Sequence, residues 1–179
     1  MYVKIIFNGL LIFLLFAVQV AFIPILPGWL SNLNLALVVL VYLLVSGKFV
    51  LTMSWAIALG FLFDTLSFVF FGLHLLSIIL AVLATNFLLK NFFTNRSLYS
   101  FAVLTTFMTL AYNALLLFGG FINGLLKQQG SIELTKYYWA GITEQLFLNL
   151  IITVILFYFL NYLSGRFKPV FLPRRHQEF

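Results

Sequence analysis

Residues 51–74 read LTMSWAIALGFLFDTLSFVFFGLH. Two apolar runs, residues 51–63 and 66–71, lie on either side of Asp64, which is the only acidic residue among the first 132. On insertion scales, a carboxylate at the centre of a membrane helix costs about 2.5–3.5 kcal/mol. We therefore expect Asp64 to lie at the end of a membrane helix and to have a specific role there.

The composition of the whole chain indicates a membrane protein. The 179 residues are 64% hydrophobic and only 8% charged, whereas soluble domains carry about 25% charged residues. This predicts an all-α integral membrane protein. Because one membrane helix needs about 20 apolar residues, the length predicts a single transmembrane domain, residues 1–179, with a bundle of about six transmembrane helices.

Prolines, glycines and polar clusters set the boundaries of six apolar segments. The predicted helices are residues 4–26, 32–46, 49–64, 73–90, 98–123 and 139–163. The first is longer than a signal-peptide core and no small-residue cleavage site follows it, so we expect it to stay attached. The second would rise about 22 Å, less than the roughly 30 Å of a bilayer core. It is either buried among the other helices or thins the bilayer locally.

The distribution of cations predicts the orientation. With six helices both termini lie on one side, and that side carries eight of the ten lysines and arginines, four of them in the basic tail, residues 164–179. The other side carries Lys127 and Lys136. By the positive-inside rule, both termini and the tail are expected in the cytoplasm, and Asp64 on the external side. The net charge of +6 is thereby explained, and nucleic acid is not an expected partner.

Four of the predicted helices carry small or polar residues at helical spacing, which places them on one face of each helix. These stripes are Thr52, Ala56, Gly60 and Asp64; His74, Ser77, Ala81 and Thr85; Thr105, Thr109 and Asn113; and Gln145, Asn149 and Thr153, with Glu144 adjacent. Membrane helices associate through such faces. The stripes are either packing seams of one bundle or the walls of a polar cavity for a ligand or ion.

The residues needed for catalysis are missing from the sequence. Asp64 is the only aspartate, whereas aspartyl proteases need two carboxylates. The chain has no His-Glu-x-x-His motif, no Gly-x-Ser-x-Gly elbow, no glycine-rich phosphate loop and no cysteine. Its two histidines are far apart. We therefore expect no enzyme activity, no cofactor and no metal. An ion-coupled transporter remains an alternative, because intramembrane carboxylates serve as relays.

The pattern Gly60-x-x-x-Asp64, a short apolar loop and then Gly72-x-His74 resembles the signature of the rod shape-determining protein MreD family. In that family, Gly-x-x-x-Asp ends one membrane helix and Gly-x-His opens the next. The length and the six apolar segments are also similar, so the resemblance covers nearly the whole chain. The sequence differs at residues 31–34, Ser-Asn-Leu-Asn, where family members often carry Pro-Asp.

This resemblance implies a non-enzymatic membrane scaffold of the bacterial elongation complex, which helps control cell shape and lateral peptidoglycan synthesis in the plasma membrane. The implied partners are an MreC-like bitopic membrane protein, MreB, RodA and a class B penicillin-binding protein, besides membrane lipid. The fold of the family is similar to that of the substrate-binding subunits of energy-coupling-factor transporters. A small-molecule-binding membrane subunit of a vitamin-type transporter is therefore an alternative.

Gly60, Asp64, Gly72 and His74 form the candidate site, as a structural motif or a partner-docking motif. Asp64 is expected either to cap the following helix, whose free N–H groups and dipole favour an anion, or to contact a partner or ligand. Gly72 would permit a positive φ. His74, in the first turn of that helix, would pair with Asp64 or share its loop.

Overall fold

A computed structural model describes residues 2–67, 71–93, 97–127 and 136–164. The helices are α1 (Tyr2–Ala17), α2 (Leu35–Val45), α3 (Phe49–Leu66), α4 (Leu73–Phe92), α5 (Leu98–Lys127) and α6 (Lys136–Ser164). Between α1 and α2 lie a π-helical turn, η1 (Val18–Phe22), and two 3₁₀ turns, η2 (Ile23–Ile25) and η3 (Gly28–Asn32). These described residues contain no β-strand, which confirms the all-α class.

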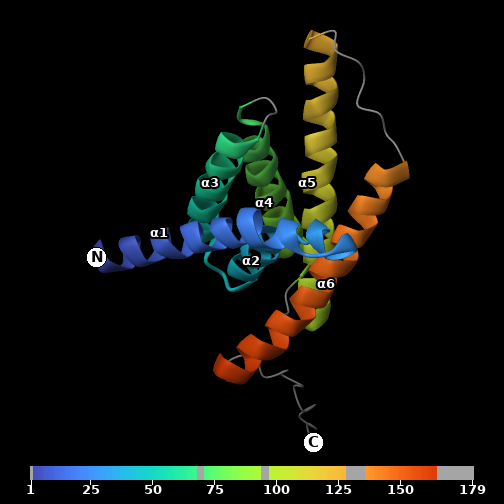
Figure 1. The fold of residues 1–179 in the computed structure, drawn as a ribbon. Helices are drawn as coiled ribbons and strands as arrows, with labels where there is room; N and C mark the ends of the chain where they lie inside the picture. Colours follow the sequence, from blue (N-terminus) through green and yellow to red (C-terminus); the bar gives the residue numbers. More distant parts are fainter. Residues whose placement is uncertain (1, 68–70, 94–96, 128–135, 165–179) are drawn as a thin grey trace, which may run out of the picture.

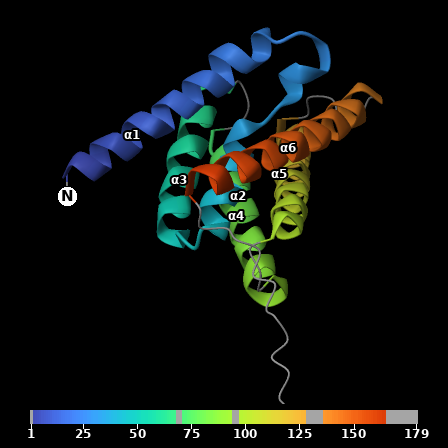
Figure 2. The same cartoon turned by 90° about the horizontal axis from the view of Figure 1, so that it is seen from below.

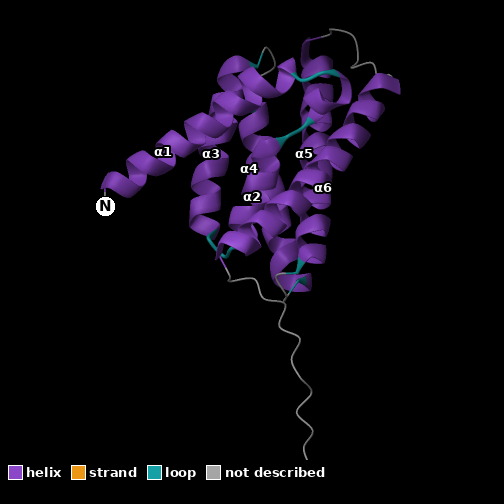
Figure 3. Ribbon diagram, turned by 60° about the horizontal axis from the view of Figure 1, so that its bottom comes forward, coloured by secondary structure: helices purple, strands orange, loops and turns teal. Residues whose placement is uncertain are grey.

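Five helical stretches are long and apolar enough to cross a membrane. They are Val3–Ile25, Phe49–Leu66, Leu73–Phe92, Leu98–Ile122 and Tyr138–Phe159. Helices α3 to α6 are each packed on the next in sequence, and α6 crosses the bundle at an angle to α5 (Figures 1 and 3). This is the architecture of a multi-pass membrane protein.

The predicted second helix, residues 32–46, is shorter in the structure and does not cross a membrane alone. Helix α2 has 11 residues and so rises only about 16 Å. It starts late because Gly28–Asn32 form η3 and the chain is extended at Leu33. Eight of its residues are buried, and it contacts all of α3, α4, α5 and α6. Of the two possibilities left open for this helix, burial among the others is therefore correct.

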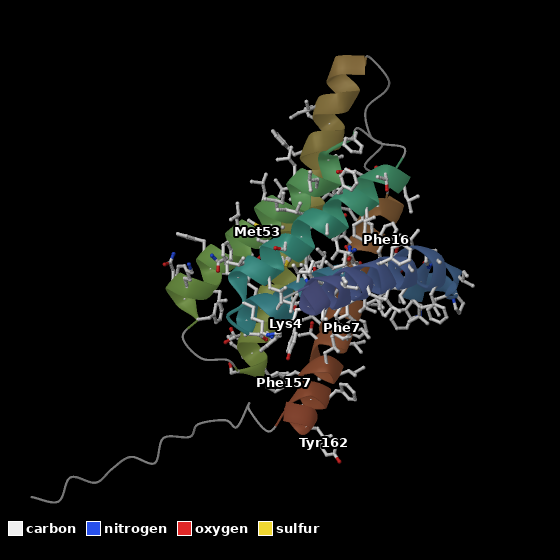
Figure 4. The ribbon with its side chains drawn as sticks, turned by 90° about the vertical axis from the view of Figure 1, so that its left-hand side faces the viewer. Lys4, Phe7, Phe16, Met53, Phe157 and Tyr162 are labelled. Carbon is white, nitrogen blue, oxygen red and sulfur yellow. The ribbon has the colours of Figure 1, made fainter. Side chains whose placement is uncertain are left out.

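Helix α1 packs on the bundle only through its C-terminal half. Leu15 and Phe16 are buried, and the Phe16 ring lies 5.6 Å from that of Phe63 on α3. Toward the N-terminus the helix extends away from the bundle (Figures 1 and 2). Figure 4 shows Phe16 between α1 and α3, whereas Lys4 and Phe7 lie away from α3. Most exposed residues of α1 are apolar, as expected of a surface in contact with lipid.

Both long C-terminal helices extend beyond their predicted limits, which were residues 98–123 and 139–163. Helix α5 continues to Lys127 and α6 begins at Lys136. Most of the polar segment between them, residues 128–135, lies outside the described residues, as does nearly all of the predicted basic tail. Helix α3 extends to Leu66 and α4 to Phe92.

Candidate functional site

The corner between α3 and α4 is organised by Asp64. Its carboxylate is buried, with 3% of the residue exposed. Oδ1 accepts a hydrogen bond from the His74 N–H at 2.9 Å, and Oδ2 accepts one from the Leu75 N–H at 3.0 Å. These two N–H groups belong to the first turn of α4 and have no acceptor within that helix. Asp64 is therefore a cap for α4, contributed by the preceding helix.

Gly72 sets the direction in which the chain enters α4. It is the N-cap residue, with φ +98°, a conformation that L side chains rarely adopt. Its carbonyl accepts the first helical hydrogen bond, from the Leu76 N–H at 2.9 Å. The glycine thus has the positive φ that the sequence suggested.

Gly60 allows α3 and α4 to approach closely. A Cβ atom built at Gly60 would lie 2.6 Å from the Cα of Leu75, so a larger residue would collide with backbone. Asp64, one helical turn later on the same face, binds the N–H of the same Leu75. Two residues of α3 therefore fix the position of Leu75 on α4: Gly60 allows the close approach and Asp64 accepts the hydrogen bond.

His74 connects the corner to α5. Its Nδ1 lies 2.9 Å from the hydroxyl oxygen of Tyr112, which is buried on α5. Its backbone N–H binds Asp64, so the imidazole and the main chain of His74 have different partners. The role of Tyr112 was not predicted, although its place beside the Thr109 and Asn113 stripe was visible in the sequence.

These interactions make the four candidate residues one rigid joint of three helices. Both oxygens of Asp64 are engaged by backbone N–H groups. Within the described residues no group of three His, Cys, Asp or Glu side chains is placed to hold a metal ion. Because both Asp64 oxygens accept backbone N–H groups of α4, the arrangement suits a structural role that holds α3 and α4 together.

Two of the predicted stripes form a polar ladder between α5 and α6. Its three hydrogen bonds join Thr153 Oγ1 to Thr105 Oγ1 at 3.1 Å, Asn149 Nδ2 to Thr109 Oγ1 at 3.0 Å and Asn113 Nδ2 to Gln145 Oε1 at 2.6 Å. The four-residue spacing on both helices brings the pairs into register. Here the stripes are a packing seam.

The start of α2 lies beside Asn149, near the middle of α6, and is satisfied by side chains. Asn149 Oδ1 accepts from the Asn34 N–H at 3.0 Å, and Gln19 Oε1 accepts from the Leu35 N–H at 2.8 Å. Asn34 Oδ1 caps the Leu37 N–H at 3.3 Å. At membrane depth, protein groups must replace water in this way. Gln19 was not predicted, although it is the only polar residue between Asn8 and Trp29.

At the end of the ladder nearest the α5–α6 connection, the two helices separate and a polar cavity of about 310 Å³ lies beside η3. It is lined by Asn32, Asn113, Tyr138, Gly141, Ile142 and Gln145. The Nδ2 of Asn32 donates to the Glu144 carboxylate at 2.7 Å. The stripes thus form a packing seam between the middle parts of α5 and α6, and Asn113 and Gln145 at one end of it also line the cavity.

The fold and the corner define a helical membrane bundle with buried polar joints. No family model matches the chain, and comparison with curated proteins and with solved structures gives no match. The function is therefore inferred from the residues and their geometry.

Proposed function

We propose that this chain is a non-enzymatic, MreD-like scaffold of the bacterial elongation complex. It would reside in the plasma membrane with both termini in the cytoplasm, in an arrangement similar to the substrate-binding subunits of energy-coupling-factor transporters. Its partners would be an MreC-like bitopic protein and, with it, MreB, RodA and a class B penicillin-binding protein. The proposal rests first on the Gly60-x-x-x-Asp64 and Gly72-x-His74 pattern.

The observation that carries the proposal is the bidentate cap made by Asp64. A proton relay or a nucleophile needs a carboxylate oxygen that is accessible to its reactant, whereas here each oxygen receives a backbone N–H of α4. An ion-coupled transporter that works through Asp64 is not favoured for the same reason. A fixed corner is what a docking protein needs, because a preformed surface loses less entropy on binding.

The corner presents such a surface. Phe61 on α3 and Phe71 just before α4 are about half exposed, at 51% and 58%. Their rings meet edge to face with centroids 5.9 Å apart. Leu66 at the end of α3 and Leu76 in the first turn of α4 are also exposed. Aromatic side chains, phenylalanine among them, are enriched in protein–protein interfaces. We assign this aromatic pair as the contact for the MreC-like partner.

The proposal is tested by replacing the resident copy in a rod-shaped host with Asp64→Asn. An asparagine places an NH₂ group against one of the two N–H donors, so the cap weakens. We expect wider, rounder cells and reduced co-purification of the MreC-like protein. Because this variant also weakens the fold, the double variant Phe61→Ala/Phe71→Ala is the companion. Normal shape and normal co-purification in both would contradict the scaffold role.

A small-molecule-binding subunit is the second candidate, and the polar cavity between α5, α6 and η3 favours it. It predicts that the protein purified from its host carries a bound small molecule. Native mass spectrometry of the detergent-solubilised chain is the test, since the scaffold role requires no such adduct.

A further inference from the structure

The volume of the polar cavity lies within the range of small-ligand sites. Its volume of about 310 Å³ is at the lower end of the range for ligand pockets, about 300–1,000 Å³. Among the described residues that line it, four carry amide or hydroxyl groups, and Gly141 and Ile142 are also in its wall. None of these described lining residues is a lysine or an arginine.

The hydrogen bonds of α5 and α6 fix the orientation of the lining amides. The Asn113 amide donates to the Thr109 backbone carbonyl at 2.8 Å, and a carbonyl only accepts, so the donor is Nδ2. The same Nδ2 donates to Gln145, which must therefore present Oε1. Among the described residues, the Asn113 Oδ1 accepts no hydrogen bond and is available as an acceptor.

Asn32 is oriented in the same way by Glu144. The carboxylate only accepts, so the Asn32 amide places Nδ2 toward it at 2.7 Å. The other end of the amide, Oδ1, lies 3.8 Å from the position that a Cβ on Gly141 would occupy. Since Gly141 lines the cavity, Asn32 Oδ1 is a second acceptor at its wall.

Glu144, the hydrogen-bond partner of Asn32, carries the negative charge at this site. It lies within the apolar segment Tyr138–Phe159 and is bound by the Asn32 amide, with no salt bridge to any described residue. Carboxylates in membrane segments are costly unless a positive group accompanies them. Tyr138 adds an aromatic ring to the lining, and such rings attract cations.

We infer that this cavity binds the ammonium group of a small organic amine. The cation would lie between the Oδ1 atoms of Asn32 and Asn113, and Glu144, bound to the other end of the Asn32 amide, would supply the opposite charge. The same group is present on soluble amines and on ethanolamine lipid headgroups. The inference deepens the second candidate function by naming the ligand chemistry, and it is independent of the aromatic pair at the α3–α4 corner.

Three probes of similar size and different charge test the inference. Thermal unfolding of the full chain in detergent is followed with ethanolamine, ethylene glycol or glycolate, at matched ionic strength. We expect a concentration-dependent rise in Tm with ethanolamine alone. An equal effect of the three probes, a preference for glycolate, or no effect of any would overturn the inference.

Two substitutions locate the site. Glu144→Gln keeps an acceptor for Asn32 but removes the charge, and we expect at least tenfold weaker ethanolamine binding. Gly141→Leu fills the cavity and should abolish binding. Gly9→Leu is the matched control, because it adds the same side chain on α1, where a Cβ would meet nothing within 4 Å, and binding should persist. Undiminished binding in folded Glu144→Gln and Gly141→Leu would overturn the assignment.

Nanodiscs separate the two sources of the amine. In phosphatidylglycerol discs, which lack any ammonium group, we expect ethanolamine to bind. If discs containing phosphatidylethanolamine abolish that binding, the headgroup is the ligand, and if binding is unchanged, the ligand is soluble. Failure to bind in phosphatidylglycerol discs would overturn the inference but leave the scaffold role intact, because that role depends on the α3–α4 corner.

Discussion

Leu75 is placed by two residues on one face of α3, since Gly60 leaves no room for a side chain beside its Cα and Asp64 binds its N–H. The motif residues therefore act together, and the loss of either should loosen the same contact. The helical spacing of Gly60 and Asp64 predicted that they share a face, and the capping of α4 followed from the position of Asp64 at a helix end. The hydrogen bond from His74 to Tyr112 could not be predicted, because it depends on how α5 packs against α4.

At this scale Gly60→Ala is predicted to destabilise the protein. The added methyl group would lie 2.6 Å from the Leu75 Cα, so α3 and α4 must separate, at a cost of about 1–3 kcal/mol in the free energy of unfolding. Reversible unfolding in mixed micelles measures it.

Gly9→Ala is the matched control for Gly60→Ala. It introduces the same methyl group on α1, where no atom lies within 4 Å, and it should be neutral or stabilising by up to about 1 kcal/mol. Equal stability of Gly60→Ala and wild type would show that α3 and α4 do not pack this closely.

Among the helices, α2 is the one that was predicted least accurately from the sequence. Its apolar run was visible, but its late start arises from η3, and its first N–H groups are satisfied by Gln19 and Asn149, which come from distant parts of the chain. Polar residues at every fourth position of α5 and of α6 predict the ladder, because this spacing places one polar stripe on each helix. The same pattern does not reveal where two helices separate, so the cavity emerged only from the tertiary arrangement.

The polar ladder leads to a prediction for Asn149. This side chain joins Thr109 on α5 to the Asn34 N–H at the start of α2, whereas Thr153 bonds only Thr105 across the helices. We expect Asn149→Leu to cost about 1–3 kcal/mol, because the part-buried Asn34 N–H loses its acceptor. Thr153→Val should cost about 0.6 kcal/mol, the usual value for such bonds in membranes. Urea unfolding of both variants in detergent compares them, and similar losses would contradict the joining role of Asn149.

At the scale of the whole molecule, four packed helices surround a short central one, and α1 extends from the side of the bundle (Figure 2). The all-α membrane class followed directly from composition. The direction in which α1 leaves the bundle could not be predicted, because a helix that is apolar all round does not show which of its faces packs on the other helices. The α3–α4 corner, the C-terminal end of α5 and the N-terminal end of α6 lie toward the same end of the bundle (Figure 1).

That common end is predicted to face outward from the cytoplasm. The chain has no cysteine, so single-cysteine variants report on topology without background. Thr65 and Lys90 are both exposed, near opposite ends of the α3–α4 pair. A membrane-impermeant maleimide added to whole cells should label Thr65→Cys and spare Lys90→Cys until the cells are permeabilised. The reverse pattern would invert the orientation.

The central claim is that the α3–α4 corner docks an MreC-like partner, and site-specific photocrosslinking in living cells tests it most directly. A photoreactive phenylalanine analogue is placed at Phe71 in the aromatic pair or at Val50, which is 79% exposed at the opposite end of α3. The account predicts a crosslink to a bitopic cell-wall protein from position 71 and none from position 50. No such crosslink from position 71, or equal crosslinks from both, would contradict it.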